Sequence, residues 1–225
     1  MITEEIVHVN GMPKKLVVFL HGYQDCAEHI ERKTIELQKM DNIALHIPQA
    51  PFANEVDLSK RQWYSIHQFD PEDRRRNAVS WDEFVDFYNR MTVGLVSANY
   101  YILQYIDGLL SEYNLSYEDL FLCGFSQGAM ITIATSLTRN SEIGGAISIA
   151  GIVPGYELLP AEIISKPSFL LLHGKEDVTV QYKTTPKTLK WFEEQNIKIK
   201  WYDFAELAHR MNDSEMQKVA DFINS

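Results

Sequence analysis

Strand-like and helix-like patterns alternate along this chain, and that alternation restricts the fold more than any other feature of the sequence. Seven short apolar runs have the length and composition of buried strands, and a small or turn-forming residue follows most of them. They span residues 6–9, 15–20, 43–47, 120–123, 146–149, 169–172 and 197–204. Helical spacing of apolar residues appears between several of these runs. The alternation predicts an α/β fold with a mainly parallel central sheet and helices on both faces.

The spacing of apolar residues predicts helices over residues 94–110, 128–137, 184–195 and 214–223. The last of these opens with Ser214 followed by Gln217, which is the spacing of a capping box. In a capping box, each of the two side chains bonds the backbone N–H of the other residue. A second such pair, Ser80 with Glu83, predicts a further helix over about residues 81–91.

The segment over about residues 51–79 fits neither pattern. It is polar, with scattered aromatic residues at Phe52, Trp63, Tyr64 and Phe69. A long irregular segment in a compact domain is usually a functional loop or a disordered one. No repeat or linker divides the chain, so residues 1–225 are expected to form a single domain with this irregular loop on its substrate side.

The chain is acidic, with a formal net charge of −10. An acidic surface repels nucleic-acid phosphates and anionic lipids, so neither is an expected partner. No apolar run approaches the roughly 18 residues of a membrane-spanning helix, so stable membrane insertion is not expected. The stretch from Met1 to Glu5 lacks the features of a signal peptide, which favours a cytoplasmic protein. The short basic run at residues 74–76 follows acidic residues and is expected to lie in a solvated loop.

A glycine-flanked serine joins one predicted strand to one predicted helix, in the pentapeptide Gly124-Phe125-Ser126-Gln127-Gly128. In that setting the pattern G-x-S-x-G is typical of the tight turn that holds a nucleophilic serine. The glycines avoid side-chain clashes, so the hydroxyl of Ser126 stands exposed above the sheet edge. The alternative is an ordinary strand-to-helix turn in which Ser126 caps the helix.

A nucleophilic serine needs a base to remove its proton and an acid to orient that base. In this type of site the acid and then the histidine follow the serine, each near the end of a strand. Only His173 and His209 follow Ser126 in the sequence. His209 is the predicted base, because His173 precedes the candidate acid and lies at the end of a strand. Asp177 is the predicted acid, and its neighbour Glu176 is the alternative.

Acyl transfer also needs two backbone N–H groups aimed at the oxyanion that develops on the attacked carbonyl. One should come from Gln127, directly after the nucleophile. The other should come from the loop after an early strand, and Tyr23 in His21-Gly22-Tyr23 is the predicted donor. The alternative is that His21-Gly22 is only a turn that ends the strand.

Together these stretches resemble the phospholipase/carboxylesterase family, which includes acyl-protein thioesterases and small bacterial carboxylesterases. The matching stretches follow the family order over nearly the whole chain. They are residues 17–22, residues 47–51, Trp63-Tyr64, residues 124–130, His173-Gly174 with Asp177, and Ala208-His209. The whole stretch Gly-Phe-Ser-Gln-Gly-Ala-Met, residues 124–130, is more diagnostic than the general pattern G-x-S-x-G.

The resemblance implies the α/β-hydrolase fold and a nearly lidless enzyme that hydrolyses carboxylic esters or thioesters. It implies a catalytic triad of Ser126, Asp177 and His209. It also implies that the backbone N–H groups of Tyr23 and Gln127 bind the oxyanion. It also implies that Ile152 and Thr179 lie near the acyl pocket, and that Trp63 lies on the loop that roofs this pocket.

The chain departs from the family pattern at positions expected to shape the pocket. Tyr23-Gln24 stands where Leu-Gly is usual, and Val178 stands where a proline usually follows the acid. Ile152 often corresponds to a tryptophan, and Ala208 stands where a glycine usually precedes the base. These changes spare the catalytic groups, so they affect the expected substrate rather than the expected reaction.

The resulting hypothesis is a two-step acyl transfer that needs no metal or cofactor, since the histidines show no ligand-spaced pair. Small acyl esters or thioesters are the expected substrates, with acylated proteins and lysophospholipids as further candidates, and a homodimer is left open. One alternative is a lipase or peptidase of the same fold. Another is a non-enzymatic binding module on a hydrolase scaffold, because fold alone does not fix function.

Overall fold

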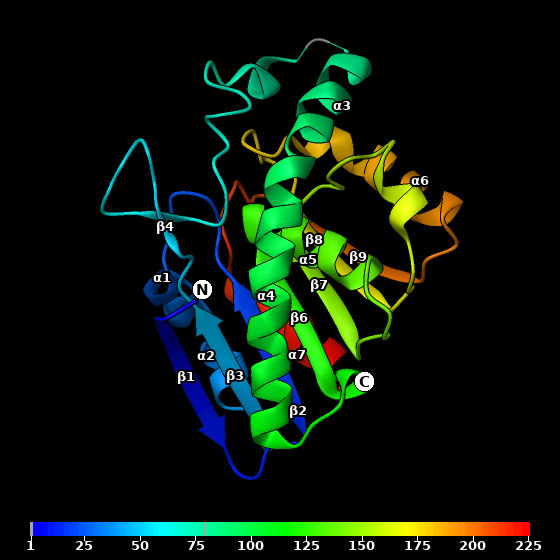
Figure 1. The fold of residues 1–225 in the computed structure, drawn as a ribbon. Coiled ribbons are helices and arrows are strands. Elements are labelled where there is room, and N and C mark those ends of the chain that lie inside the picture. Colours follow the sequence, from blue (N-terminus) through cyan, green and yellow to red (C-terminus); the bar gives the residue numbers. More distant parts are fainter. Residues whose placement is uncertain (1, 79) are drawn as a thin grey trace.

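Within residues 2–78 and 80–225, which the computed structural model describes, seven strands form one central sheet (Figure 1). Their order across the sheet is β1-β3-β2-β6-β7-β8-β9. The strand β1 runs antiparallel to β3, and the other neighbouring pairs are parallel. The strands are β1 (Glu5–Asn10), β2 (Lys15–Leu20), β3 (Ile43–Pro48), β6 (Leu120–Phe125), β7 (Gly145–Ile149), β8 (Phe169–Gly174) and β9 (Ile199–Phe204). The predicted α/β architecture is confirmed, and each predicted strand overlaps one of these seven.

Helices cover both faces of the sheet (Figure 1). One face carries α4 (Thr92–Tyr113), α5 (Gln127–Leu137) and α6 (Thr185–Glu194), and α3 (Trp81–Arg90) continues this layer beyond the upper edge of the sheet. The other face carries α1 (Ala27–Lys33), α2 (Ile35–Gln38) and α7 (Asp213–Asn224). No helix in the described part of the chain has the combination of length and apolar character that would let it cross a bilayer.

The strand β2 shows why both faces must be covered. Its successive side chains point to opposite sides of the sheet. Leu16, Val18 and Leu20 join the apolar core beneath α4 and α5. Val17 and Phe19 join the core beneath α1, α2 and α7. All five side chains are fully buried, so the continuous apolar run in the sequence reflects a strand between two helical layers.

The predicted helices are present, but one predicted helix start is wrong. The side chain of Ser80 accepts a hydrogen bond from the N–H of Glu83, and α3 begins at Trp81 as expected. For α7, however, the capping box is formed by Asn212 and Glu215, not by Ser214 and Gln217. Asn caps a helix as well as Ser does, and the Asn-x-x-Glu spacing two residues earlier satisfies the same pair of N–H groups.

The irregular segment over residues 51–79 is held by short elements rather than by a long one, and its last residue, Val79, lies outside the described residues. The strands β4 (Phe52–Ala53) and β5 (Arg61–Gln62) pair antiparallel.

Four short 3-10 helices occur along the described chain. They are η1 (Arg74–Asn77), η2 (Tyr117–Asp119), η3 (Leu159–Glu162) and η4 (Tyr182–Thr184).

The basic run at residues 74–76 is only partly the solvated loop that was predicted. Arg74 and Arg76 are exposed, but Arg75 is buried. Its guanidinium bonds the carboxylate of Asp70 at 2.8 Å and that of Asp73 at 2.6 Å. A buried arginine needs such partners, because an unpaired charge away from water is costly. The acidic residues before the run therefore hold it against the protein.

Candidate active site

Ser126 occupies a strained turn between β6 and α5. Its backbone has φ 53° and ψ −112°, a conformation that costs a residue with a side chain about 1–3 kcal/mol. The N–H of Ser126 donates to the carbonyl of Ile149 on the neighbouring strand at 2.9 Å. A Cβ atom at Gly124 would lie 2.3 Å from the Gly128 carbonyl, and one at Gly128 would lie 2.3 Å from the Leu20 carbonyl. Both glycines are therefore required by close backbone packing around the serine.

His209 comes from the loop between β9 and α7 and lies beside Ser126. Its Nε2 is 2.9 Å from the Oγ of Ser126, and its Nδ1 is 2.7 Å from Oδ2 of Asp177. The ring also packs against Phe125, with the ring centroids 4.9 Å apart. Of the two histidines that follow Ser126, both within the described residues, His209 is the one hydrogen-bonded to the serine. The structure thus brings together the three residues predicted from the sequence.

Asp177 lies in the loop after β8 and is held by its own loop as well as by His209. Its Oδ1 accepts hydrogen bonds from the N–H groups of Thr179 and Val180 at 2.8 and 2.9 Å. Burial raises the pKa of this carboxyl, but hydrogen bonds from His173 and His209 outweigh burial and lower the pKa to about 2. Asp177 is therefore a carboxylate at neutral pH. Its sequence neighbour Glu176, the alternative acid, is exposed, whereas Asp177 is buried.

The two predicted oxyanion donors lie on either side of Ser126, one at the start of α5 and one on the loop after β2. Gln127 is the first residue of α5, and N–H groups in the first turn of a helix have no partner within the helix. Such groups favour negative charge. A Cβ atom at Gly22 would lie 3.3 Å from Cβ of Ser126, so the loop that carries Tyr23 passes directly beside Ser126. That the N–H groups of Tyr23 and Gln127 point at the carbonyl oxygen of a bound substrate stays a prediction.

The side chain of Gln127 has a role that the sequence did not indicate. It is fully buried, its Oε1 accepts from the N–H of Trp63 at 3.1 Å, and its Nε2 donates to the carbonyl of Tyr64 at 2.8 Å. The indole N–H of Trp63 in turn donates to the carbonyl of His21 at 2.8 Å. These contacts join the irregular segment to both loops that flank Ser126. No local pattern marks a buried glutamine as a link of this kind.

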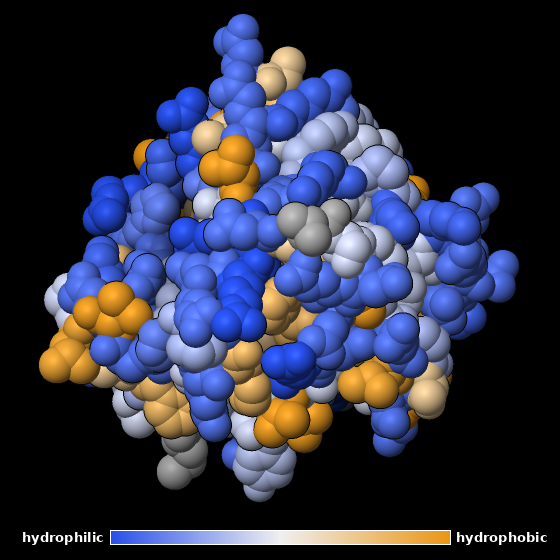
Figure 2. Space-filling model, turned by 90° about the horizontal axis from the view of Figure 1, so that it is seen from above, coloured by the Kyte–Doolittle hydropathy of each residue, from blue (hydrophilic) through white to orange (hydrophobic). Residues whose placement is uncertain are grey.

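The three residues predicted to contact substrate are buried or partly buried. Trp63 and Ile152 are fully buried, and Thr179 is partly buried with its N–H bonded to Asp177. Their contact with an acyl chain stays a prediction. An apolar groove of about 480 Å³ lies beside Trp63 and Tyr64, between β4–β5 and the start of α4, and Phe52 contributes to its lining. From above, the surface over the carboxyl ends of the strands is mostly hydrophilic with separate apolar patches (Figure 2).

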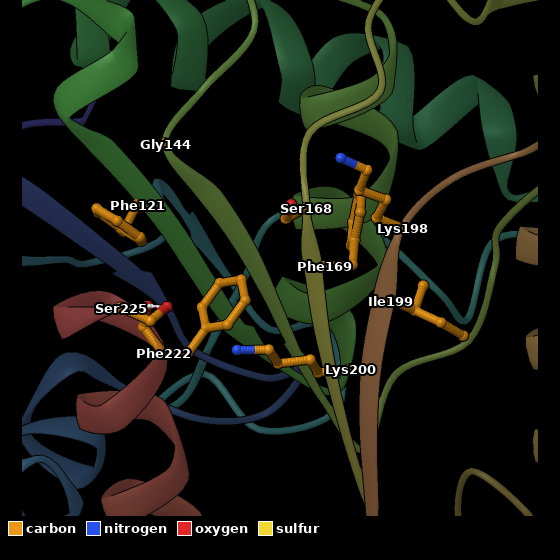
Figure 3. A pocket seen from close by; sticks show the side chains of 9 residues that line it. All are labelled: Phe121, Gly144, Ser168, Phe169, Lys198, Ile199, Lys200, Phe222 and Ser225. Carbon is orange, nitrogen blue, oxygen red and sulfur yellow. Dashed lines mark hydrogen bonds between the residues drawn. The ribbon is translucent and has the colours of Figure 1, made fainter.

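A second pocket, of about 380 Å³, lies at the opposite end of the sheet (Figure 3). Its lining includes Phe121, Ser168 and Ile199, which lie at the amino ends of β6, β8 and β9. Ser126 follows the carboxyl end of β6, so a ligand in this pocket would lie far from the serine. Among the described residues, no group of three or more His, Cys, Asp or Glu side chains is arranged to hold a metal ion.

Comparison with known proteins identifies the family of this chain. The model of the phospholipase/carboxylesterase family matches the chain over residues 1–225. The chain belongs to that family. The family membership predicted from the motifs is confirmed, and so is the class of enzyme, a serine hydrolase.

Individual relatives of this family member are distant but cover nearly its whole length. It is 25% identical to acyl-protein thioesterase 1 of Neurospora crassa, over 92% of this chain and 84% of that protein. It is 23% identical to carboxylesterase SOBER1 of Arabidopsis thaliana, over 94% of this chain and 90% of that protein. The crystal structure of esterase PE8 is similar with a TM-score of 0.82 at 22% identity, over 98% of this chain and 96% of that one. The α/β-hydrolase fold is thereby confirmed.

Proposed function

We propose that this family member hydrolyses acyl esters or thioesters through a Ser126–His209–Asp177 triad and an acyl-enzyme intermediate. The observation that most supports this proposal is the hydrogen-bonded series from Ser126 Oγ to His209 Nε2 at 2.9 Å and from His209 Nδ1 to Asp177 Oδ2 at 2.7 Å. A nucleophile, a base and an acid in that order are what activation of a serine hydroxyl requires. The names of the relatives, thioesterase and carboxylesterase, support a carboxylic acyl group as the part of the substrate that reacts.

The first half of the proposed reaction forms the acyl-enzyme. Oγ of Ser126 attacks the carbonyl carbon while Nε2 of His209 takes the hydroxyl proton. Asp177 stays ionised and stabilises the imidazolium that forms. The N–H groups of Tyr23 and Gln127 receive the oxyanion of the tetrahedral intermediate. The bond to the alkoxide or thiolate then breaks, and His209 returns its proton to that leaving group.

The second half releases the acid. His209 removes a proton from a water molecule while the water oxygen attacks the acyl carbon. The bond from the acyl carbon to Ser126 Oγ then breaks, and His209 returns the proton to this oxygen. We assign the acyl chain to the groove beside Trp63 and Tyr64, because Phe52, Phe69 and Val93 line it and the N–H of Trp63 bonds Gln127, the neighbour of Ser126. An acid product with a hydrocarbon tail is therefore proposed.

Labelling with a fluorophosphonate tests the nucleophile directly. The wild type should be labelled and should hydrolyse both p-nitrophenyl esters and acyl thioesters, whereas Ser126→Ala should lose labelling and turnover. Ser111→Ala is the matched control, because Ser111 is exposed on α4, and it should behave as the wild type. Labelling that persists in Ser126→Ala would remove Ser126 as the nucleophile. Absence of any labelling or turnover would favour a binding module instead.

A series of esters and thioesters of increasing chain length tests the substrate class. Turnover that increases with chain length up to a limit is expected if the groove holds the acyl chain. Cleavage of peptide amides at a comparable kcat/KM would favour the peptidase alternative over the esterase.

A further inference from the structure

Oδ2 of Asp177 lies within reach of two imidazole rings. Nδ1 of His209 is 2.7 Å from this oxygen, and Nε2 of His173 is 3.2 Å from the same oxygen. His173 lies in β8, only four residues before the acid, and it is 4% exposed, while the side chain of Asp177 is fully buried. The proposed mechanism uses only His209. The second histidine is therefore a buried ionisable group in direct contact with the catalytic acid and without an assigned role.

The partners of His173 determine where its proton lies. Its Nε2 is 2.8 Å from the backbone carbonyl of Val180, and a carbonyl only accepts hydrogen bonds. Asp177 is a carboxylate and also only accepts. Nε2 must therefore carry a hydrogen, which it donates to the Val180 carbonyl at 2.8 Å while facing Oδ2 of Asp177 at 3.2 Å. On the other side of the ring, Nδ1 is 3.4 Å from the hydroxyl of Thr185, which can donate to it. The two acceptors beside Nε2 therefore place a hydrogen on that nitrogen of His173.

The carboxylate of Asp177 is then hydrogen-bonded on both oxygens. Oδ1 receives the N–H groups of Thr179 and Val180. Oδ2 bonds His209 at 2.7 Å and has a longer contact of 3.2 Å with Nε2 of His173, which also lowers the pKa of this carboxyl. Each donor withdraws negative charge that would otherwise act on the imidazolium of His209. The donor from His173 differs from the backbone donors, because it shares the very oxygen that bonds His209.

We propose that His173 is a positioning residue of the reaction, which fixes Oδ2 of Asp177 toward His209 and moderates its charge, and so sets the pH at which His209 becomes free to act as base. This inference rests on the proposed function. It assigns to His173 an effect on catalysis that is transmitted through Asp177, without contact between His173 and the substrate.

Other ionisable groups surround the two residues and are the same in every variant of the test below. Glu215 on α7, whose pKa burial raises to about 7, and Tyr88 on α3 interact electrostatically with Asp177. On β9, Asp203 pairs in register with His173, and its carboxylate is bonded by Lys175 at 2.8 Å. The ring of Tyr182 packs edge-on against His173, and its hydroxyl donates a hydrogen bond to Asp203.

A matched pair of substitutions separates the effect of the hydrogen-bond donor of His173 from the effect of the volume that its ring fills. His173→Gln places an amide N–H near the former position of Nε2, and His173→Met has nearly the same length and volume but no donor. The measurement is the pH profile of kcat/KM, whose acid limb reports the base of the free enzyme. Without the donor, Oδ2 of Asp177 acts more strongly on His209 and favours its protonated form. The acid limb should therefore move to higher pH.

In His173→Met the acid limb should rise by about 0.5 pH unit or more, and kcat should fall about tenfold, with KM little changed. In His173→Gln the acid limb should return close to the wild-type position. If the limb lies at the same pH in both variants and in the wild type, His173 only fills space and the inference is wrong. Fluorophosphonate labelling of Ser126 in the wild type is measured in parallel. If the wild type is labelled but the acid limb does not move in His173→Met, only this inference is wrong. If the wild type is not labelled, the proposed function itself is wrong.

The wild-type protein provides a second test if His173→Met does not fold. In protein labelled with ¹⁵N-histidine, the ring nitrogen shifts of His173 should show hydrogen on Nε2. The Nε2–H signal of His173 should also move when the charge on His209 changes, because both rings face one oxygen of Asp177. An Nε2 without hydrogen, or a His173 signal that does not respond to His209, would overturn the inference.

Discussion

Replacing Gln127 by Ala removes the buried side chain that joins the irregular segment to the nucleophile turn. Two backbone groups then lose their partners, the N–H of Trp63 and the carbonyl of Tyr64. Trp63 is fully buried and Tyr64 nearly so, which limits the access of replacement water. An unsatisfied buried polar group costs about 1–3 kcal/mol, so Gln127→Ala should lower the free energy of unfolding by about 2–6 kcal/mol. In a protein of this size that corresponds to a fall in Tm on the order of 10 °C.

Urea unfolding followed by circular dichroism measures this change, with an unchanged m-value as the sign that both states keep their compactness. Gln104→Ala is the matched control, because Gln104 is exposed on α4 and bonds only the hydroxyl of Tyr100. Its effect should stay within about 0.5 kcal/mol. Equal unfolding free energies for Gln127→Ala and Gln104→Ala would show that the buried contacts of Gln127 do not stabilise the fold, and the reasoning would fail.

Further substitutions test the turn, the helix cap and the triad. Gly128→Ala should destabilise the protein by about 1–3 kcal/mol, because the new methyl group would lie 2.3 Å from the Leu20 carbonyl; normal stability in urea would contradict this. Burial raises the pKa of Glu215 from 4.5 to about 7. The folded state therefore binds this proton more tightly than the unfolded state, and stability should fall by about 3 kcal/mol as pH rises from 4.5 through 7. Glu215→Gln should lose this decline in urea midpoints measured at pH 5 and pH 8, and an unchanged decline would assign it to other groups. Asp177→Asn should lower kcat about 10⁴-fold while leaving the fold stable, and activity within tenfold of the wild type would exclude Asp177 as the acid.

The sheet could be predicted because its strands are buried on both faces and therefore form continuous apolar runs. The same argument placed Ser126 at a strand-to-helix turn. The two short helices α1 and α2 were not predicted, since they span 7 and 4 residues. Helices so short show too few buried positions for a repeating apolar stripe, and α2 buries only Leu37.

The contacts that support the site could not be predicted, because they depend on register and on loop paths. Nothing near Gln127 in the sequence indicates that its amide meets Trp63, 64 residues away. His173 was considered only as a rival to His209 for the role of base. Its contact with Asp177 arises because the loop after β8 turns back over the end of its own strand, where Val180 and Asp177 both face the ring.

The geometry of the proposed triad is fixed by the packing and hydrogen bonds of the protein itself. The positive φ of Ser126 is unfavourable, yet α5 is buried over its whole length, so the turn cannot relax without moving a helix that packs against the sheet. Asp177 likewise cannot rotate without breaking hydrogen bonds at both of its oxygens. Groups held in this way need no reorganisation while charge develops on the oxyanion and on His209, and such preorganisation is a major source of rate acceleration in acyl transfer. The packing of α5 therefore holds the strained turn at Ser126, and hydrogen bonds hold Asp177. A substitution in these supporting residues should alter the proposed catalysis without touching the substrate.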